Sequence, residues 1–409
     1  MSTSPCSRAP CPVSTTKSFW TSDPNSTPAN DETPPPLLCG LLLAACGQRA
    51  ARPIGDFTLP VYTPRYASGF EITGAAGSRS TLVTVHNPWY GDEVTDQYLF
   101  IARDGEPAPA GFEGQVLRDE ARRVVCMSGS YIAMLDALGA ADRVVGVSGA
   151  QYLINETLRR RIARGEAADV GFDSNVDFER LMALRPDLVM LFGIGGADTA
   201  LTGKLRELGI PYLYMGEHCE ESPLGKSEWV VVAAEIAGLR TEGSRLFAAI
   251  PERYERLRAL AQQTAARPRV MLNTPYRDTW FMPTRNSYMV RLLEDAGARY
   301  VFEENTATQT LPIDIEQAYY LTSKSDFWLN VSGCNTLDEV RRQNPRLADT
   351  PPVREGRVYD NNRRRNAAGG SDFWESGVLR PDRVLADLVH IFHPELSETD
   401  ELYYYRQLE

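Results

Sequence analysis

The sequence predicts an α/β protein with two parallel-sheet lobes joined by a single long helix, and with a small N-terminal antiparallel β element in front of them. Three observations support this prediction. Apolar residues recur at helical spacing near the middle of the chain. Short apolar runs alternate with helical patterns on both sides of that stretch, which is typical of parallel sheets covered by helices. The segment SYIAMLDALGAADRVVGV (130–147) is echoed by SYMVRLLEDAGARYVF (287–302), which indicates a duplicated lobe.

The long helix is expected over residues 241–266. Its apolar stripe advances in steps of four, four, three and four residues through Leu246, Ile250, Tyr254, Leu257 and Ala261. Thr241 is a suitable N-cap, and Pro251 removes one backbone donor, which predicts a kink. At about 1.5 Å per residue, this helix would be about 35–40 Å long, enough to span a domain.

The predicted organisation is a leader at 1–46, a tether at 47–66, the β element at 67–120, lobe one at 121–221, a helical linker with the long helix at 222–266, and lobe two with the C-terminal tail at 267–409. Within the β element, strands are expected at 69–73, 81–86 and 98–103. Residues 1–36 are rich in Ser, Thr and Pro and lack periodicity, so we do not expect them to join the fold.

Composition narrows the classes of partner and site. The net charge of -11 argues against nucleic acid or an anionic membrane surface as the main ligand. No apolar run approaches the ~20 residues that a membrane-spanning helix needs. The seven cysteines form neither a disulfide framework nor a zinc pattern, and none of the four histidines pairs with another at ligand spacing on a loop. No metal site is therefore expected.

A short apolar run at 37–45 is followed by Cys46 and Gly47. The run has the length of a signal-peptide core and is too short to span a membrane. Together with Cys46 it resembles the cleavage box of bacterial lipoproteins, which implies that Cys46 is lipidated and that the protein is exported to the periplasm and anchored to a membrane. The run is preceded by acidic residues and prolines instead of Lys or Arg, so a buried helix fragment remains the alternative.

The segments RVVCMSGSYIAMLDALGAADRVVGVSG and ERLMALRPDLVMLF carry a family resemblance over residues 122–393. They are similar to the substrate-binding proteins of bacterial ABC importers for iron chelates and cobalamin. The resemblance implies that an iron complex (siderophore or haem) or cobalamin is held between the lobes and passed to a permease dimer. It implies neither catalytic residues nor a resident cofactor.

The resemblance also implies that Glu179 and Glu316 dock onto the permease. Each lies at the start of a short helix, and the two helices are equivalent in the two lobes. The helix dipole favours a carboxylate at this position. Two such charges on separate lobes would orient docking more than strengthen it. The alternative is an ordinary solvated glutamate in a first helical turn.

Candidate ligand-binding residues follow the predicted strands, where open α/β sheets bind ligands. They are Ser130, Tyr131 and Phe172 in lobe one, and Tyr276, Arg277, Trp280, Arg363, Arg364 and Trp374 in lobe two. Aromatic faces suit a corrin, porphyrin or catechol ring, and guanidinium groups suit anionic chelates. Core packing of the tryptophans and a solvated basic loop are the alternatives. Gly195 and Gly196 lack the spacing and lysine of a phosphate loop.

Two other functions compete with import. A metal-chelatase-like enzyme on the same fold would need a catalytic histidine or carboxylate facing the ligand, and the sequence offers no His/Asp/Ser or Cys/His set that can be placed together. A surface lipoprotein could capture ligand without a permease. The sequence leaves open which ligand is bound, the true start residue, which membrane carries the anchor, and the oligomeric state.

Overall fold

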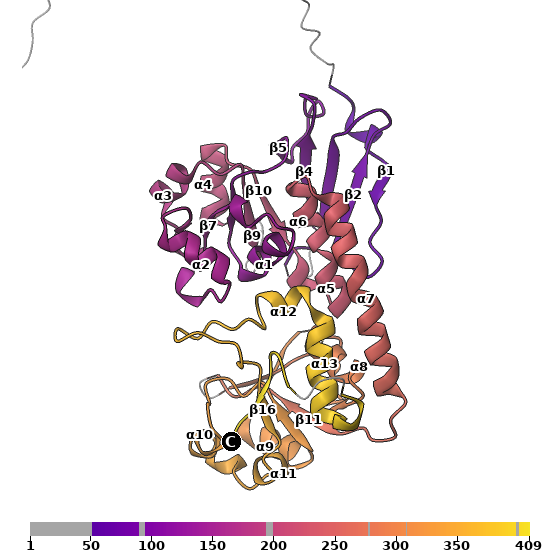
Figure 1. The fold of residues 1–409 in the computed structure, drawn as a ribbon, viewed down its shortest axis with the longest axis vertical. Coiled ribbons are helices and arrows are strands. Elements are labelled where there is room, and N and C mark those ends of the chain that lie inside the picture. The colour runs from indigo at the N-terminus through magenta and orange to yellow at the C-terminus, as the bar shows by residue number, and fades with distance from the viewer. Residues whose placement is uncertain (1–50, 90–94, 194–198, 277–278, 308, 398–400) are drawn as a thin grey trace, which may run out of the picture. The chain divides into compact units, whose positions relative to one another are not determined.

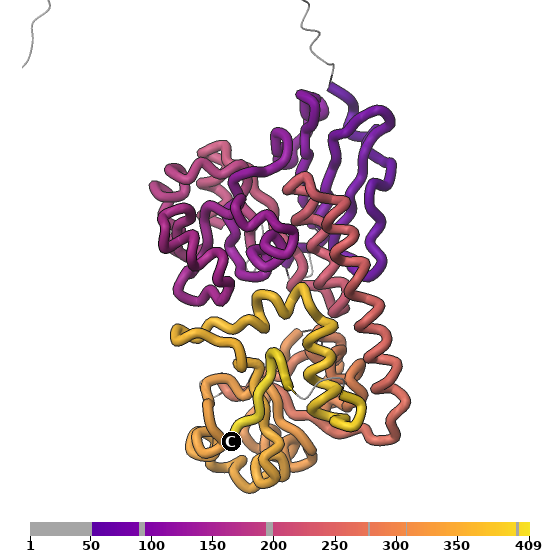
Figure 2. The backbone as a smooth tube through the Cα atoms, viewed as in Figure 1, coloured from indigo at the N-terminus to yellow at the C-terminus, as the bar shows by residue number. Residues whose placement is uncertain are grey.

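The computed structural model describes residues 51–89, 95–193, 199–276, 279–307, 309–397 and 401–409. Arg49–Glu409 forms one compact unit. Within it, the described strands build three five-stranded sheets and one two-stranded sheet, and the long helix α7 (Arg240–Gln262) runs from beside α6 and the N-terminal sheet down along lobe two (Figures 1 and 2). The predicted fold class, two parallel-sheet lobes joined by a long helix, is confirmed. None of the described helices is long and apolar enough to cross a membrane.

The N-terminal sheet has the strand order β1-β2-β3-β4-β5. Its strands are β1 (Leu59–Tyr62), β2 (Phe70–Gly74), β3 (Thr81–His86), β4 (Asp96–Ala102) and β5 (Gln115–Arg118). Neighbouring strands are antiparallel except β4 and β5, which are parallel. The sheet is therefore mixed, whereas the sequence predicts a purely antiparallel element. Alternate residues such as Val83 and Leu99 face the main core, while Leu82 and Phe100 form a smaller cluster on the other side.

The region 47–66 was predicted to be a tether, and the structure corrects this for its second half. Strand β1 lies there, and the hydroxyl of Tyr62 donates a 2.7 Å hydrogen bond to Glu228. The fully buried Glu228 carboxylate also accepts backbone N–H groups from Arg65, Tyr66 and Ala67, each at 2.8 Å. The partner of this segment lies more than 160 residues away, so local composition gave no sign of it.

Lobe one contains an all-parallel sheet of order β10-β9-β6-β7-β8. Its strands are β6 (Val124–Cys126), β7 (Val144–Val147), β8 (Ala168–Asp169), β9 (Leu188–Phe192) and β10 (Tyr212–Met215), and its helices are α1 (Gly129–Ala137), α2 (Glu156–Ala163), α3 (Phe178–Leu184) and α4 (Ala200–Leu208). The central strands are nearly continuous apolar runs because helices cover both faces of a parallel sheet.

Helices α5 (Pro223–Glu228) and α6 (Val230–Ile236) lead into α7. The prediction that Thr241 caps α7 is wrong, because the cap position is Leu239 and no side chain bonds there. The buried stripe contains four of the five predicted residues, while Phe247 takes the buried place expected for Leu246, which is half-buried. Pro251 lies inside the helix and is buried. The 23 residues correspond to about 35 Å.

Lobe two has the sheet order β13-β11-β15-β16-β17, parallel except for the edge strand β17. Its strands are β11 (Arg269–Leu272), β13 (Arg299–Tyr300), β15 (Phe327–Leu329), β16 (Val358–Asp360) and β17 (Arg406–Gln407), and β12 (Trp280–Met282) and β14 (Leu311–Ile313) form a separate two-stranded antiparallel sheet. Its helices are α8 (Tyr288–Asp295), α9 (Ile315–Ser323), α10 (Leu337–Gln343), α11 (Pro351–Arg354), α12 (Ser376–Leu379) and α13 (Pro381–Phe392).

The C-terminal tail returns to lobe two, which the sequence did not predict. The buried carboxylate of Asp387 in α13 accepts the backbone N–H groups of Tyr403, Tyr404 and Tyr405 at 2.8, 2.6 and 2.9 Å. These bonds hold the tail in place so that β17 pairs with β16.

Candidate functional site

The carboxyl ends of β6, β7, β9 and β10 lie at one edge of the lobe-one sheet, because these strands are parallel neighbours. The loops that leave this edge carry Ser128, Gly149, Gly193 and Glu217. Ser128 caps α1 by accepting the N–H of Ser130. The edge therefore gathers four separate loops, two of which bring a polar side chain, Ser128 or Glu217.

A buried carboxylate occupies this edge. Glu217 is 2% exposed, and its Oε1 accepts a 2.9 Å hydrogen bond from the hydroxyl of Ser130. Among the described residues, its Oε2 has no hydrogen-bond partner. Burial raises the pKa of Glu217 to about 7, although the charge of Lys226 and the bond from Ser130 act in the opposite direction. The Lys226 ammonium also lies 4.8 Å from the ring centroid of Tyr288 in α8.

Ser130 and Tyr131 do not present accessible side chains to a ligand, which corrects their prediction as contact residues. Both are buried. The hydroxyl of Tyr131 donates to the carbonyl of Leu191 at 3.2 Å, and Ser130 is bonded to Glu217. This face of the short helix α1 packs into lobe one. Sequence reasoning missed Glu217, although its place directly after a buried strand was a signal that could have found it.

Two aromatic side chains of lobe one are accessible. Phe172 is 42% exposed and Tyr152 is 45% exposed, and their ring centroids lie 6.2 Å apart. Gly149, in a left-handed conformation with φ of 66°, lets the backbone approach Phe172, because a Cβ there would lie 2.7 Å from the ring. Phe172 therefore remains a candidate ligand contact, and Tyr152 is a second one that the sequence reasoning missed.

A third accessible aromatic side chain comes from lobe two. Trp374 is 58% exposed and packs edge-to-face on the buried Phe373, with centroids 4.8 Å apart. The next residue, Glu375, accepts the backbone N–H groups of Ile154 and Asn155 at 2.6 and 2.9 Å. Figure 1 shows the segment that leads to α12 running between the lobes. Aromatic faces from both lobes therefore lie beside one interlobe contact.

The two arginines predicted to bind an anionic ligand have partners within the chain. Arg363 pairs with Glu401 at 3.1 Å. Arg364 pairs with the buried Asp372 at 2.7 Å, and its guanidinium lies 4.7 Å from the ring centroid of Tyr403. An anion would have to compete with these carboxylates, so ligand contact by Arg363 and Arg364 stays a prediction.

The loop after β11 gives three outcomes. Trp280 is 1% exposed, stacks on Trp328 at 5.6 Å and donates its indole N–H to the carbonyl of Leu272. It is a core residue, so its prediction as a ligand contact is wrong. Tyr276 is exposed, and its role stays a prediction. Arg277 lies outside the described residues.

Glu179 and Glu316 are both exposed in the first turns of α3 and α9. Each helix begins with an aspartate cap, Asp177 or Asp314, which accepts the N–H three residues later. Glu316 pairs with Arg346 at 3.0 Å on the surface. This equivalence of position is compatible with docking, which stays a prediction. The predicted lipidation site, Cys46, lies outside the described residues.

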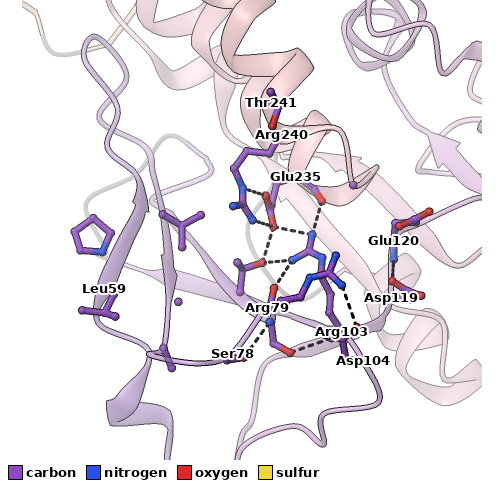
Figure 3. A pocket seen from close by; sticks show the side chains of 17 residues that line it. Leu59, Ser78, Arg79, Arg103, Asp104, Asp119, Glu120, Glu235, Arg240 and Thr241 are labelled. Atoms are coloured by element: carbon purple, nitrogen blue, oxygen red, sulfur yellow. Dashed lines mark hydrogen bonds and ion pairs between the residues drawn. The ribbon is translucent and has the colours of Figure 1, made fainter.

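A pocket of about 770 Å³ lies apart from these residues, between the N-terminal sheet and the helices α6 and α7 (Figure 3). At its centre Glu235, whose side chain is fully buried, pairs with Arg240 and, at 2.8 Å, with Arg103, and it accepts a 2.6 Å hydrogen bond from Thr81. Because these charged groups pair with one another, we interpret the pocket as part of the structural contact between the sheet and the helices, and not as a ligand site. Within the described ranges, no cluster of three or more His, Cys, Asp or Glu side chains is placed to hold a metal.

Two α/β lobes joined by one long helix, with accessible aromatic side chains beside the contact between them, define a two-lobed solute-binding protein. The chain belongs to the Periplasmic binding protein family, whose profile matches residues 124–363. The matched region begins after the sheet β1–β5.

Similar proteins and solved structures cover most of the chain. An uncharacterized lipoprotein of Methanocaldococcus jannaschii is 25% identical over 332 residues, which cover 76% of this chain and 77% of the relative. A periplasmic heme-binding protein from Pseudomonas aeruginosa superposes with a TM-score of 0.55 at 19% identity, over 71% of this chain and 98% of its own. An ABC-type Fe3+-hydroxamate transport system protein from Saccharomonospora viridis gives 0.50 at 17% identity, over 67% and 94%. The two solved structures establish the shared fold.

Proposed function

We propose that this protein is a lipid-anchored substrate-binding protein that captures an iron complex (siderophore or haem) or cobalamin between its lobes and delivers it to an ABC importer permease. The observation that carries the proposal is the position of the exposed aromatic side chains. Tyr152 and Phe172 of lobe one and Trp374 of lobe two lie beside the same interlobe contact.

The aromatic faces favour a ligand with a flat ring system. A ring that stacks on such a side chain gains dispersion and buries apolar area on both partners. Because Arg363 and Arg364 already pair with carboxylates of the chain, stacking is the contact most available to a ligand. Haem and catechol-type iron chelates offer rings of this kind. The similar solved structures include a heme-binding protein and an Fe3+-hydroxamate transport protein, which supports iron complexes as cargo.

Delivery to a permease is supported by Glu179 and Glu316, which occupy corresponding first helical turns on the two lobes and are exposed. Membrane anchoring is supported by the sequence around Cys46 and by the naming of the Methanocaldococcus relatives as lipoproteins. A protein tethered in this way would hold its ligand close to the permease and raise the local concentration of both.

Native mass spectrometry tests ligand capture. The protein would be incubated in turn with haem, a ferric catecholate, a ferric hydroxamate and cobalamin. We expect one of these to be retained at a ratio of one to one. Retention of none of them by a folded protein would overturn the proposal.

The docking part has a separate test. Reversing both charges, with Glu179→Lys and Glu316→Lys, should leave ligand affinity unchanged and abolish stimulated uptake in vesicles that contain the permease. Reversal of an exposed glutamate away from these helices, Glu252→Lys, is the matched control. Unchanged uptake in the double variant would refute docking through these residues, and would favour a surface lipoprotein that works without a permease.

A further inference from the structure

The loop at 366–375 of lobe two makes direct contacts with residues 151–155 of lobe one. The side-chain amide of Asn366 donates to the carbonyl groups of Gln151 and Leu153 at 2.9 and 3.1 Å. At the other end of the loop, each carboxylate oxygen of Glu375 accepts one backbone N–H from lobe one, those of Ile154 and Asn155. The loop and its partner segment are more than 200 residues apart in the sequence.

The middle of the loop lies against the same segment. Gly370 approaches the backbone of Tyr152 so closely that a Cβ on Gly370 would overlap the carbonyl oxygen of Tyr152. Backbone that close cannot be relieved by a side-chain rotation, so only glycine fits at this position. On the far side, a Cβ on Gly129 would lie 2.7 Å from the side chain of Glu375, which places this carboxylate against the start of α1.

The loop has its own internal structure. The Asn366 side-chain oxygen accepts the backbone N–H groups of Ala368 and Gly370, both at 3.0 Å. The hydroxyl of Ser371 donates to the carbonyl of Asn361 at 2.7 Å, and Arg365 and Ser371 form an antiparallel bridge. Because these bonds shape the loop from within lobe two, it can hold lobe one without first being ordered by it.

We infer that residues 366–375 form a clasp that holds the two lobes together at 151–155 and fixes Trp374 next to this contact. Glu375 and Asn366 are its positioning residues, and the clasp must release before the lobes can separate. The role in ligand exchange rests on the proposed function, whereas the clasp itself rests on the interlobe contacts alone.

Amide hydrogen exchange tests the clasp without any ligand. In the full-length protein, the N–H groups of Ile154 and Asn155 should be protected because Glu375 accepts both of them. Gly370→Ala should speed their exchange at least tenfold, since the added methyl group pushes the loop away from Tyr152. The control is Gly203→Ala in α4, where a Cβ meets nothing within 4 Å. Unchanged protection in Gly370→Ala would overturn the inference.

Asn366→Ala and Glu375→Gln keep the test independent of Gly370. Asn366→Ala removes the two bonds to the carbonyls of lobe one and should also raise exchange at residues 154–155. Glu375→Gln replaces one accepting oxygen with an amide that cannot accept, so one of the two N–H groups should lose protection. If both variants melt like the parent protein and show parent-like exchange, the clasp is refuted even where Gly370→Ala fails to fold.

A ligand experiment then separates the clasp from the proposed function. With haem as the probe, the dissociation rate should rise about tenfold in Gly370→Ala, which corresponds to the loss of one or two ordinary hydrogen bonds. Faster exchange at residues 154–155 in a protein that binds no haem, chelate or corrinoid would support the clasp and contradict the proposed function. An unchanged dissociation rate in a protein that does bind haem would contradict the role in ligand exchange.

Discussion

The hydroxyl of Tyr62 in β1 donates a 2.7 Å hydrogen bond to Glu228 in α5 and so joins the N-terminal sheet to the helices that lead into α7. A second buried carboxylate continues the contact, because Glu220 accepts the N–H groups of Ser68 and Gly69 and the indole N–H of Trp229. Backbone donors that would otherwise be buried without partners are satisfied by these two side chains. The sheet is therefore an integral part of the folded body.

Replacement of the Glu228 carboxylate should lower the stability of the protein. Glu228→Gln puts an amide nitrogen where an acceptor is needed, so at least one N–H among residues 65–67 loses its partner. We expect a loss of about 2–4 kcal/mol in the free energy of unfolding, measured by urea denaturation. Glu252→Gln, on the exposed face of α7, should change it by less than about 0.5 kcal/mol. Equal effects of the two variants would contradict the anchoring role.

The two tryptophans near the lobe-two loops should respond in opposite ways. Trp280→Ala removes a buried ring that stacks on Trp328 and should cost about 3–5 kcal/mol of stability. Trp374→Ala should leave the midpoint of unfolding nearly unchanged and weaken ligand binding about tenfold, measured by titration with the ligand identified by mass spectrometry. A Trp374→Ala protein with parent-like affinity would remove Trp374 from the ligand site.

The crossing of α6 and α7 depends on a glycine. A Cβ on Gly243 would overlap that of Ala234, so Gly243→Ala should lower the free energy of unfolding by about 1–3 kcal/mol. The same substitution at Gly203, inside α4 and facing open space, should raise it by about 0.5–1 kcal/mol through the entropy of the unfolded chain. Thermal unfolding of the pair measures both signs. A stabilised Gly243→Ala protein would show that the helices can move apart at little cost.

Stability should depend on pH through Glu217. Burial raises its folded pKa to about 7 from 4.5, so the folded state holds this proton more tightly than the unfolded state. The contribution is therefore fully present below pH 4.5 and is lost as pH rises through 7, with a total on the order of 3 kcal/mol. The groups facing Glu217 are Lys226, Ser130 and Tyr131. Glu217→Gln should flatten this decline between pH 5 and pH 8 in urea denaturation, relative to the parent protein.

His218, the next residue, acts in the opposite direction. Burial lowers its pKa to about 4, so the unfolded state binds the proton more tightly. Its contribution is present above pH 6.5 and is lost as pH falls toward 4. The Glu217→Gln protein should therefore lose stability on acidification more steeply than the parent protein does. An identical pH profile for the two proteins would contradict the burial of Glu217.

The fold could be predicted because short stretches of the sequence indicate its helices and strands. Continuous apolar strands, helices closed by glycine and the stripe along α7 are each visible within about 20 residues of sequence. The duplicated segments added the two-lobed arrangement. The same reasoning failed at β1, because nothing near Tyr62 indicates that Glu228 satisfies its hydroxyl and the N–H groups that follow.

The candidate site was harder to predict, because its residue types serve several purposes. Trp280 and Trp374 look alike in the sequence, yet one is in the core and the other is on the surface. Arg364 reads as an anion binder until Asp372 is placed beside it. Tyr152 and Glu375 escaped notice because their importance comes from a contact between segments that meet only in the folded chain. Phe172 was predicted and is accessible, since an aromatic residue in a loop after a strand has few partners in the core.

The proline in α7 has a mechanical consequence. Before it, Phe247 packs against Tyr66 of the N-terminal region; after it, Tyr254 bonds to Asp295 of lobe two at 2.7 Å. Pro251 supplies no backbone N–H, so the carbonyl of Phe247 cannot accept the hydrogen bond that a helix normally forms with the residue four positions later. Helix α7 is therefore easiest to bend at Pro251, between its contact with the N-terminal region and its contact with lobe two. A rotation of one part of the molecule relative to the other would bend the helix there first.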